Sequence, residues 1–472
     1  MKKIVIIAIS AIFLASCTKD ITSLNVNSKS AAVVPSQTLF TKAQLTLANA
    51  LASPSVNLNI FRLLAQQWNE TTYTDEANYD LVTRNIPQGW WNTMYRDVIK
   101  NFEEAKSLIP TDVTSVVTQK NEIAIADILQ VYTYYHLVTT FGNIPYSEAL
   151  NASIVQPKYD DAATVYGALL TRLDADIAAL SVSGTSFDGA DIIYNGNVGS
   201  WKKFANTLKL KMGILISDSD AAKAKTVVEA AAAGAFSSAA DNASFAFLAS
   251  PPNTNPVWVS LVQSGRKDFV AANTLVNAMQ ALNDPRIPLY FTTDGGGGYS
   301  GGVYGANSNY STYSKPSLTL QAPDYPVLFL DYSEVEFIKA EAIERGFNVG
   351  GTAATHYNNA ITASIVYWGG ATTDAITYLA QPSVNYATAS GNYKQKIGNQ
   401  EWIALYNRGY DAWTTWRRLQ YPQLVAPASA LSPIPVRYTY PVNEQNLNQA
   451  NYTAAAAAIG GDKVTTKLFF NK

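Results

Sequence analysis

Apolar residues recur at helical spacing through two long stretches of this chain, and this periodicity constrains the fold more than any other feature. The first stretch runs from about residue 35 to residue 233, and the second from Tyr332 to Gln420. Within residues 160–180 the apolar positions repeat every four residues and form one stripe, at Val165, Leu169, Leu173 and Ile177. Such a pattern, sustained over most of the chain, predicts a mostly α fold.

Polar, Gly and Pro breaks set the bounds of the individual helices. The helices that we expect are Ser36–Ala52, Val56–Asn69, Trp90–Ile109, Asn121–Thr140, Asp160–Leu180, Trp201–Ile216, Ala221–Ala233, Tyr332–Arg345, Thr352–Trp368 and Lys394–Gln420. Their spacing allows a layer of repeated helix pairs, although no clean 34-residue repeat is present. Near the C-terminus the apolar run Lys467–Phe470 predicts a short strand.

Between the two helical stretches, residues 236–326 are rich in Gly, Pro, Asn and Tyr. Seven glycines lie between Gly295 and Gly305. They do not follow a strand and open a helix, which argues against a phosphate-binding loop. We expect a long exposed loop or a short hairpin here. The organisation that follows is a single domain over residues 35–472 with a loop-rich insertion at about 236–326.

The N-terminus has the pattern of a secretory signal. Lys2 and Lys3 precede the apolar run Ile4–Leu14, which is too short to span a bilayer, and small residues follow up to Cys17. The segment Leu14–Cys17 resembles the lipobox of bacterial lipoproteins, in which the Cys is lipidated and becomes the first mature residue. We therefore expect a signal peptide at 1–16, a lipid on Cys17 and a linker at 17–34. An ordinary signal peptide with an incidental Cys is the alternative.

The composition excludes several classes of function. The 472 residues carry 34 Lys and Arg against 36 Asp and Glu, which gives no basic surface for nucleic acid. One Cys cannot form an intrachain disulfide or a thiolate metal site, and two His leave little for a zinc centre, so we expect no metal and no cofactor. His136 lies in an apolar helical segment and is expected to be a core residue, whereas His356 has no partner at metal-ligand spacing. A pair of catalytic carboxylates stays possible, because their separation is spatial.

Aromatic residues are the remaining candidates for function, since the chain has 28 Tyr, 17 Phe and 9 Trp. Aromatic faces stack on sugar rings and other flat apolar surfaces, and they do so best from exposed loops. Two segments, 73–91 and 299–313, combine aromatics with loop residues. The ligand-binding candidates are Tyr73, Tyr79, Trp90, Tyr299 and Tyr304. The competing interpretation is a place in the helix core for Trp91 and Tyr95, and exposed residues without a function for the tyrosines beside glycines.

Nine segments, taken in order, carry the pattern of a known family. They are Phe141–Leu150 (FGNIPYSEAL), Pro157–Leu170, Asp191–Met212, Arg266–Arg286, Ser333–Phe347, Ala360–Gly369, Trp413–Pro422, Pro433–Asn448 and Gly460–Phe470. Together they resemble the SusD/RagB-type nutrient-binding outer-membrane lipoproteins. The sequence departs from the family pattern at Asn143, where Asp is usual, and at Phe469 and Phe470, where Trp is common.

The resemblance implies a mostly α SusD-like fold, with tetratricopeptide-like helix pairs as the scaffold and irregular loops as the ligand face. It implies a lipoprotein on the outer membrane, facing the cell exterior, that is not an enzyme. It also implies a partner, a SusC-like TonB-dependent transporter barrel, to which the protein delivers captured oligosaccharides. A peptide ligand, a lipid-anchored glycoside hydrolase and a purely structural lipoprotein are the alternatives. Ligand residues vary across the family, so the five candidate aromatics rest on the loop argument alone.

Overall fold

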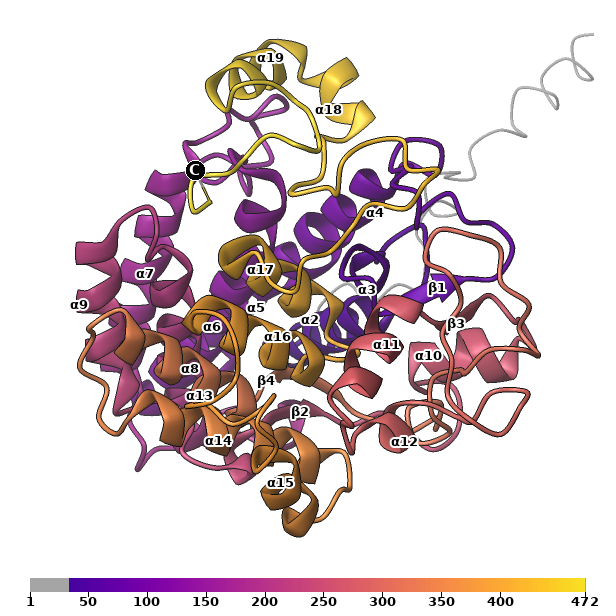
Figure 1. Cartoon of the computed structure of the whole chain (residues 1–472). Coiled ribbons are helices and arrows are strands. Elements are labelled where there is room, and N and C mark those ends of the chain that lie inside the picture. The colour runs from indigo at the N-terminus through magenta and orange to yellow at the C-terminus, as the bar shows by residue number, and fades with distance from the viewer. Residues whose placement is uncertain (1–33, 472) are drawn as a thin grey trace, which may run out of the picture. The chain divides into compact units, whose positions relative to one another are not determined.

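The long helices pack against their neighbours in sequence, and the resulting pairs contact one another (Figure 1). The structure is a computed structural model that describes residues 34–471. The pairs are α6 (Val116–Phe141) with α7 (Ala162–Ala179), α8 (Val198–Leu215) with α9 (Ala221–Ala232), α13 (Tyr332–Glu344) with α14 (Ala353–Tyr367), and α16 (Tyr393–Ala404) with α17 (Gly409–Leu419). Helix α8 joins the pairs, because it contacts both α7 and α13. The predicted mostly α fold is confirmed.

Most of these helices begin with an N-cap residue whose side chain supplies the hydrogen-bond acceptor that the N–H groups of the first turn lack. Their N-cap oxygens accept a hydrogen bond from a backbone N–H in the first turn, at Ser115, Asp161, Asn197, Asp220, Asp331, Thr352 and Asn392. Each such cap stabilises its helix by about 1 kcal/mol. The polar breaks in the sequence therefore set the helix starts through a specific hydrogen bond.

The remaining elements lie before α6, in the connections between the pairs and near the C-terminus. Before α6 the chain forms α2 (Ser36–Ala52), α3 (Phe61–Leu64), α4 (Ile86–Asn92), the π-helix η2 (Thr93–Ile99) and α5 (Lys100–Asp112). Shorter elements follow, which are η3 (Asp188–Ala190), η4 (Ala239–Asp241), α10 (Pro256–Trp258), η5 (Val259–Gln263), α11 (Asn273–Ala281), α12 (Ile287–Tyr290), α15 (Thr372–Leu379), α18 (Val442–Leu447) and α19 (Gln449–Ala458). Within residues 34–471 no helix has the length and apolar character that crossing a membrane requires.

Three predicted elements are wrong. The segment 56–69 is not one helix, because the chain turns at Gln66, with φ of 53°, and enters strand β1 (Trp68–Glu70). The segment 394–420 is two helices, since Asn407 has φ of 66° and breaks the run between α16 and α17. The apolar run 467–470 forms a turn with Leu468 and Phe470 buried, so its pattern reflects burial rather than strand pairing.

Two short antiparallel sheets hold the insertion, residues 236–326, to the rest of the fold. Strand β2 (Ala243–Phe245) pairs with β4 (Val327–Leu330), which ties the two ends of the insertion together. In its middle, β3 (Phe269–Ala271) pairs with β1 from the N-terminal part, with Glu70 opposite Phe269. This pairing brings residues near 70 and near 268 together although they lie almost 200 positions apart in the sequence.

The glycine-rich segment is more ordered than an exposed loop. Asp294 accepts hydrogen bonds from the N–H groups of Gly296 and Gly298 at 2.9 and 3.0 Å. Gly301 lies so close to the start of α11 that an added Cβ would stand 2.3 Å from the Asn273 nitrogen. Residues 295–298 are exposed, but Gly301, Gly302 and Gly305 are buried. Close backbone packing therefore explains the later glycines.

Both histidines have structural partners. His136 is fully buried, and its Nδ1 lies 2.8 Å from the carbonyl oxygen of Tyr132. Burial lowers the pKa of His136 to about 4. The expected core position is confirmed. His356 lies with Nδ1 at 2.8 Å from the Glu336 carboxylate and Nε2 at 3.0 Å from the carbonyl oxygen of Gly350.

A candidate ligand-binding cleft

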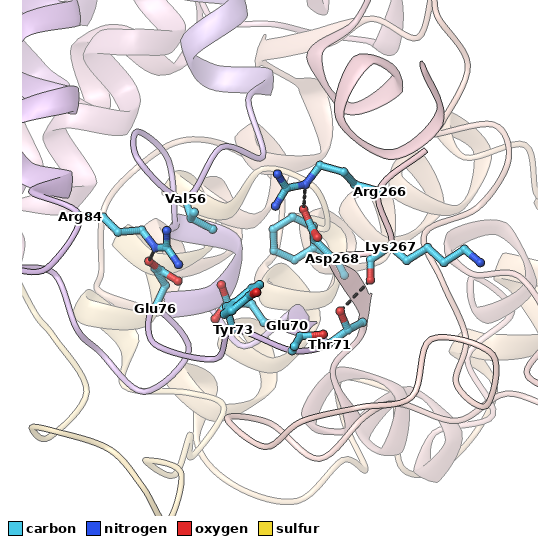
Figure 2. Close-up of a pocket in the computed structure, with 11 residues that line it drawn as sticks. Val56, Glu70, Thr71, Tyr73, Glu76, Arg84, Arg266, Lys267 and Asp268 are labelled. Atoms are coloured by element: carbon cyan, nitrogen blue, oxygen red, sulfur yellow. Dashed lines mark hydrogen bonds and ion pairs between the residues drawn. The ribbon is translucent and has the colours of Figure 1, made fainter. Parts of the chain in front are cut away.

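A cleft of about 450 Å³ opens beside the β1–β3 sheet (Figure 2). The sheet extends into its wall, because the Thr71 N–H donates to the Asp268 carbonyl at 2.8 Å and the Thr71 hydroxyl to the Lys267 carbonyl at 2.6 Å. The residues that line the cleft are Val56, Glu70, Thr71, Thr72, Tyr73, Glu76, Arg84, Arg266, Lys267, Asp268 and Phe269. The cleft thus exists only because β3 of the insertion pairs with β1.

Tyr73 is the one predicted site residue that lines this cleft. Its side chain is 68% exposed, and in Figure 2 it lies between Arg84 and Arg266. A tyrosine ring that stays accessible beside polar side chains presents a flat apolar face together with a hydroxyl. The expected exposure is therefore present at Tyr73.

Three other predicted aromatics are buried, and their expected exposure is wrong. Trp90 has no accessible surface and packs edge-on against Phe61, with ring centroids 5.0 Å apart. Tyr304 donates its hydroxyl to the Leu63 carbonyl at 2.6 Å, and the Tyr79 hydroxyl accepts from Gln66 at 3.2 Å. A ring with no accessible face cannot stack on a ligand in this conformation.

Tyr299 has an intermediate position. It is half-buried against the main core, and its backbone carbonyl accepts a hydrogen bond from Gln280 at 2.7 Å. It does not line the cleft. The two aromatic segments do meet, since the Tyr79 and Tyr304 rings are 6.4 Å apart, but they meet as packed core. The competing interpretation of core packing holds for Trp91 as well, which is 6% exposed.

Two carboxyl groups lie against each other at the floor of the cleft. Glu70 is buried, accepts a hydrogen bond from the Ala77 N–H at 2.9 Å and lies near the carboxyl group of Glu76. Burial, and next the contact with Glu76, raises the pKa of Glu70 to about 9. Glu76 is fully buried and forms an ion pair with Arg84. At neutral pH the Glu70 carboxyl group is therefore protonated.

Basic side chains form the rim. Arg266 forms an ion pair with Asp268, with Nε 2.5 Å from the carboxylate, and remains 63% exposed. Lys267 lies beside the Tyr310 ring, with Nζ 5.8 Å from its centroid. The search for exposed aromatics missed these residues and the carboxyl pair. Their positions in the sequence do not indicate that they share a site, because the pairing of β1 with β3 brings them together.

The buried carboxyl pair does not resemble the pair of a glycoside hydrolase. Glycoside hydrolases keep their two carboxyl groups about 5–9.5 Å apart, so that a sugar or a water fits between them. Glu70 and Glu76 are both buried, and Glu76 is held in an ion pair with Arg84. Within residues 34–471, no cluster of three or more His, Cys, Asp or Glu side chains is arranged to hold a metal.

A second hollow is lined by aromatics that the sequence analysis did not select. Tyr325 and Trp368 stack with ring centroids 5.9 Å apart, and Tyr367 and Tyr406 complete the aromatic lining. Its volume is only about 20 Å³, far below that of the cleft. Ligand pockets typically enclose several hundred Å³. We therefore regard the cleft as the candidate site.

The chain belongs to the SusD-like family. A family model described as "Starch-binding associating with outer membrane" matches residues 27–441. Among solved structures, a SusD homolog from Bacteroides uniformis is 26% identical with a TM-score of 0.79, and the match covers 92% of this chain and 99% of that chain. The resemblance that the sequence segments indicated is confirmed.

Two further structures share the fold over the same lengths. A chitin-binding protein is 24% identical with a TM-score of 0.80, and a chitin-binding SusD homolog from Flavobacterium johnsoniae is 23% identical with a TM-score of 0.79. Each match covers 92% of this chain and 99% of the other. No curated protein matches the sequence.

Proposed function

We propose that this protein captures oligosaccharides in the cleft beside β1 and β3 and passes them to a SusC-like TonB-dependent transporter. The observation that carries the proposal is the exposed Tyr73 ring in a cleft lined by hydrogen-bonding side chains. Sugars need both, because the ring faces of a pyranose are apolar and its hydroxyls are polar. Membership of a family described as starch-binding supports a carbohydrate ligand.

The second part of the proposal concerns location. We propose that Cys17 is lipidated and anchors the protein on the outer face of the outer membrane. Cys17 lies outside the described residues, so this part rests on the Leu14–Cys17 pattern and on the family description. A C17A variant expressed in the native host should lose incorporation of labelled palmitate, and affinity purification of the parent should retain a transporter barrel. Palmitate labelling of C17A at the parent's level would contradict the anchor.

The test of the site is Tyr73→Ala. We expect the parent to be retarded in native gels that contain a bound polysaccharide, and the variant to lose most of this retardation. One stacked ring is worth about 0.5–1.5 kcal/mol beyond its buried area, or roughly tenfold in affinity. Tyr73 packs against little, so the variant should unfold at the parent's temperature.

Tyr367→Ala is the matched control, because Tyr367 belongs to the second hollow and not to the cleft. Loss of retardation in Tyr367→Ala but not in Tyr73→Ala would move the site to that hollow. Binding of peptides, but not of glycans, would show that the ligand is a peptide and not an oligosaccharide. The appearance of new reducing ends during incubation with glycans would show a hydrolase instead of a binding protein.

A further inference from the structure

We infer that the oligosaccharide bound in the cleft is acidic and carries carboxylate groups, as uronic acids do. This inference rests on the proposed function and names the class of ligand for the same site. It comes from the charges around the cleft and from the hydrogen-bond donors that the protein itself leaves unused.

The charged groups of the cleft do not balance. On one side, Arg84 is offset by Glu76 and by Asp75, whose carboxylate lies 3.7 Å from Nη2 of Arg84. On the β3 side, Asp268 pairs with Arg266, whereas Lys267 and Lys315 have no ion-pair partner within residues 34–471. An excess of positive charge therefore lies on the β3 side.

Arg266 keeps donors available for a ligand, whereas Arg84 is engaged by Glu76 and Asp75. Figure 2 shows Arg84 and Arg266 reaching toward the cleft from opposite sides, with Tyr73 between them. Arg266 uses only Nε on Asp268, and within residues 34–471 its two terminal nitrogens make no hydrogen bond. A guanidinium edge with two free N–H groups matches the two oxygens of a carboxylate.

Lys267 extends the positive charge along the rim. Its ammonium group has no carboxylate partner within the described part of the chain, and it lies 5.8 Å from the centroid of the Tyr310 ring. The ammonium group of Lys315 lies 5.3 Å from the same centroid, and it too has no ion-pair partner there. An oligomer that runs from Tyr73 toward Tyr310 would thus meet cations at more than one sugar unit.

A neutral glycan would gain little from this arrangement. Its hydroxyls can bond to any polar side chain, and exposed cations without an anion stay hydrated. A chain of carboxylates would instead form charge-assisted hydrogen bonds at several points, each modest at an exposed rim but repeated along the ligand. Because these hydrogen bonds are repeated along the ligand, the preference for an acidic over a neutral oligomer should be large enough to measure.

Isothermal titration of the full-length protein with an oligogalacturonate and with its carboxyl-reduced counterpart tests the inference. We expect the acidic form to bind about tenfold more tightly, since hydrogen bonds to charged groups add roughly that much. The preference should shrink at high salt because screening weakens exposed ion pairs. Arg266→Gln should remove most of the preference, so that the variant binds the two oligomers with nearly equal affinity.

Lys120→Gln is the control, because it removes the same charge from an exposed position on α6 that does not line the cleft. Equal affinity for the two oligomers, with no effect of Arg266→Gln, would overturn the acidic ligand and leave oligosaccharide binding intact. Binding of no glycan at all, acidic or neutral, would overturn both. Tighter binding of a sulfated oligomer of the same charge would overturn the assignment to carboxylates.

Discussion

At the scale of single residues, the fold gives Glu70 a chemistry that free glutamate does not have. The ordinary pKa of the side chain is 4.5, and burial together with the neighbouring Glu76 raises the pKa of Glu70 to about 9. The folded state therefore holds one proton more than the unfolded chain between these two values. Its contribution to the free energy of unfolding is full below pH 4.5 and is lost as the pH rises through about 9.

Replacement of Glu70 by Gln should remove this dependence. The amide keeps the shape and the donor of the protonated acid, and its oxygen can still accept from Ala77. Between pH 6 and pH 8 the free energy of unfolding of the parent should fall by up to about 1.4 kcal/mol per pH unit relative to Glu70→Gln, which is the value for one proton. Urea titrations at several pH values measure it. A parallel pH dependence in the two proteins would contradict the raised pKa.

Glu104→Gln is the matched control, because Glu104 lies exposed on α5 and pairs with Lys100 at 3.2 Å. An exposed pair of this kind is worth at most about 1 kcal/mol. This variant should keep the pH dependence of the parent, so that the comparison isolates the buried carboxyl pair.

At the scale of elements, the packing of α17 against α3 depends on one glycine. Gly409 begins α17, and an added Cβ would lie 2.3 Å from the Arg62 nitrogen and 2.6 Å from the Phe61 carbonyl carbon. Backbone atoms of a buried helix cannot move aside as a flexible side chain can. The close contact of these two helices thus requires a residue without a side chain.

Gly409→Ala should lower the free energy of unfolding by about 1–3 kcal/mol or more, the usual cost of overpacking a filled core. Gly167→Ala offers the opposite case, because Gly167 lies inside α7 and a Cβ there would meet only the flexible end of Lys223 at 3.2 Å. Removal of a helix-interior glycine should stabilise the protein by about 0.5–1 kcal/mol. Thermal unfolding of both variants checks the signs. A Gly409→Ala variant as stable as the parent would show that α3 and α17 can separate freely.

At the scale of the whole molecule, buried ion pairs connect helices that belong to different pairs. Lys211 on α8 is 2.6 Å from Glu334 on α13 and also pairs with Asp411 on α17. Arg408 binds the same two carboxylates at 2.7 and 2.8 Å. All four side chains are less than a tenth exposed. Their charges are satisfied only when the three helices are correctly placed.

Lys211→Met should therefore destabilise the protein strongly. Without Lys211, Arg408 alone faces the carboxylates of Glu334 and Asp411, so one buried negative charge is no longer compensated. Removing one partner of a buried ion pair typically costs about 3–5 kcal/mol, even where the methionine fills the space. Lys100→Met removes an exposed partner of Glu104 and should cost less than about 1 kcal/mol. Chemical denaturation distinguishes the two. Equal, small losses would mean that water reaches the buried network.

The sequence predicted the helical scaffold well, because an apolar stripe such as the one through Val165 and Leu169 indicates both a helix and the face that it buries. It predicted breaks less well. At Gln66 the chain has positive φ although glutamine has no preference for it, because the chain must turn there to enter strand β1. Local preference could not reveal this turn. Asn407 also has positive φ, which asparagine tolerates, so its residue type does indicate a helix end.

For the candidate site the difference is larger. By itself the sequence determined the mostly α class, the resemblance to the SusD-like family and the scarcity of groups for catalysis, because these depend on local periodicity, on ordered segments and on composition. Only the tertiary structure decided that Tyr73 is accessible while Trp90 and Tyr304 are core, and that Glu70, Arg84 and Arg266 share one cleft. The physical reason is that exposure and proximity arise from contacts between distant segments, here the pairing of β1 with β3.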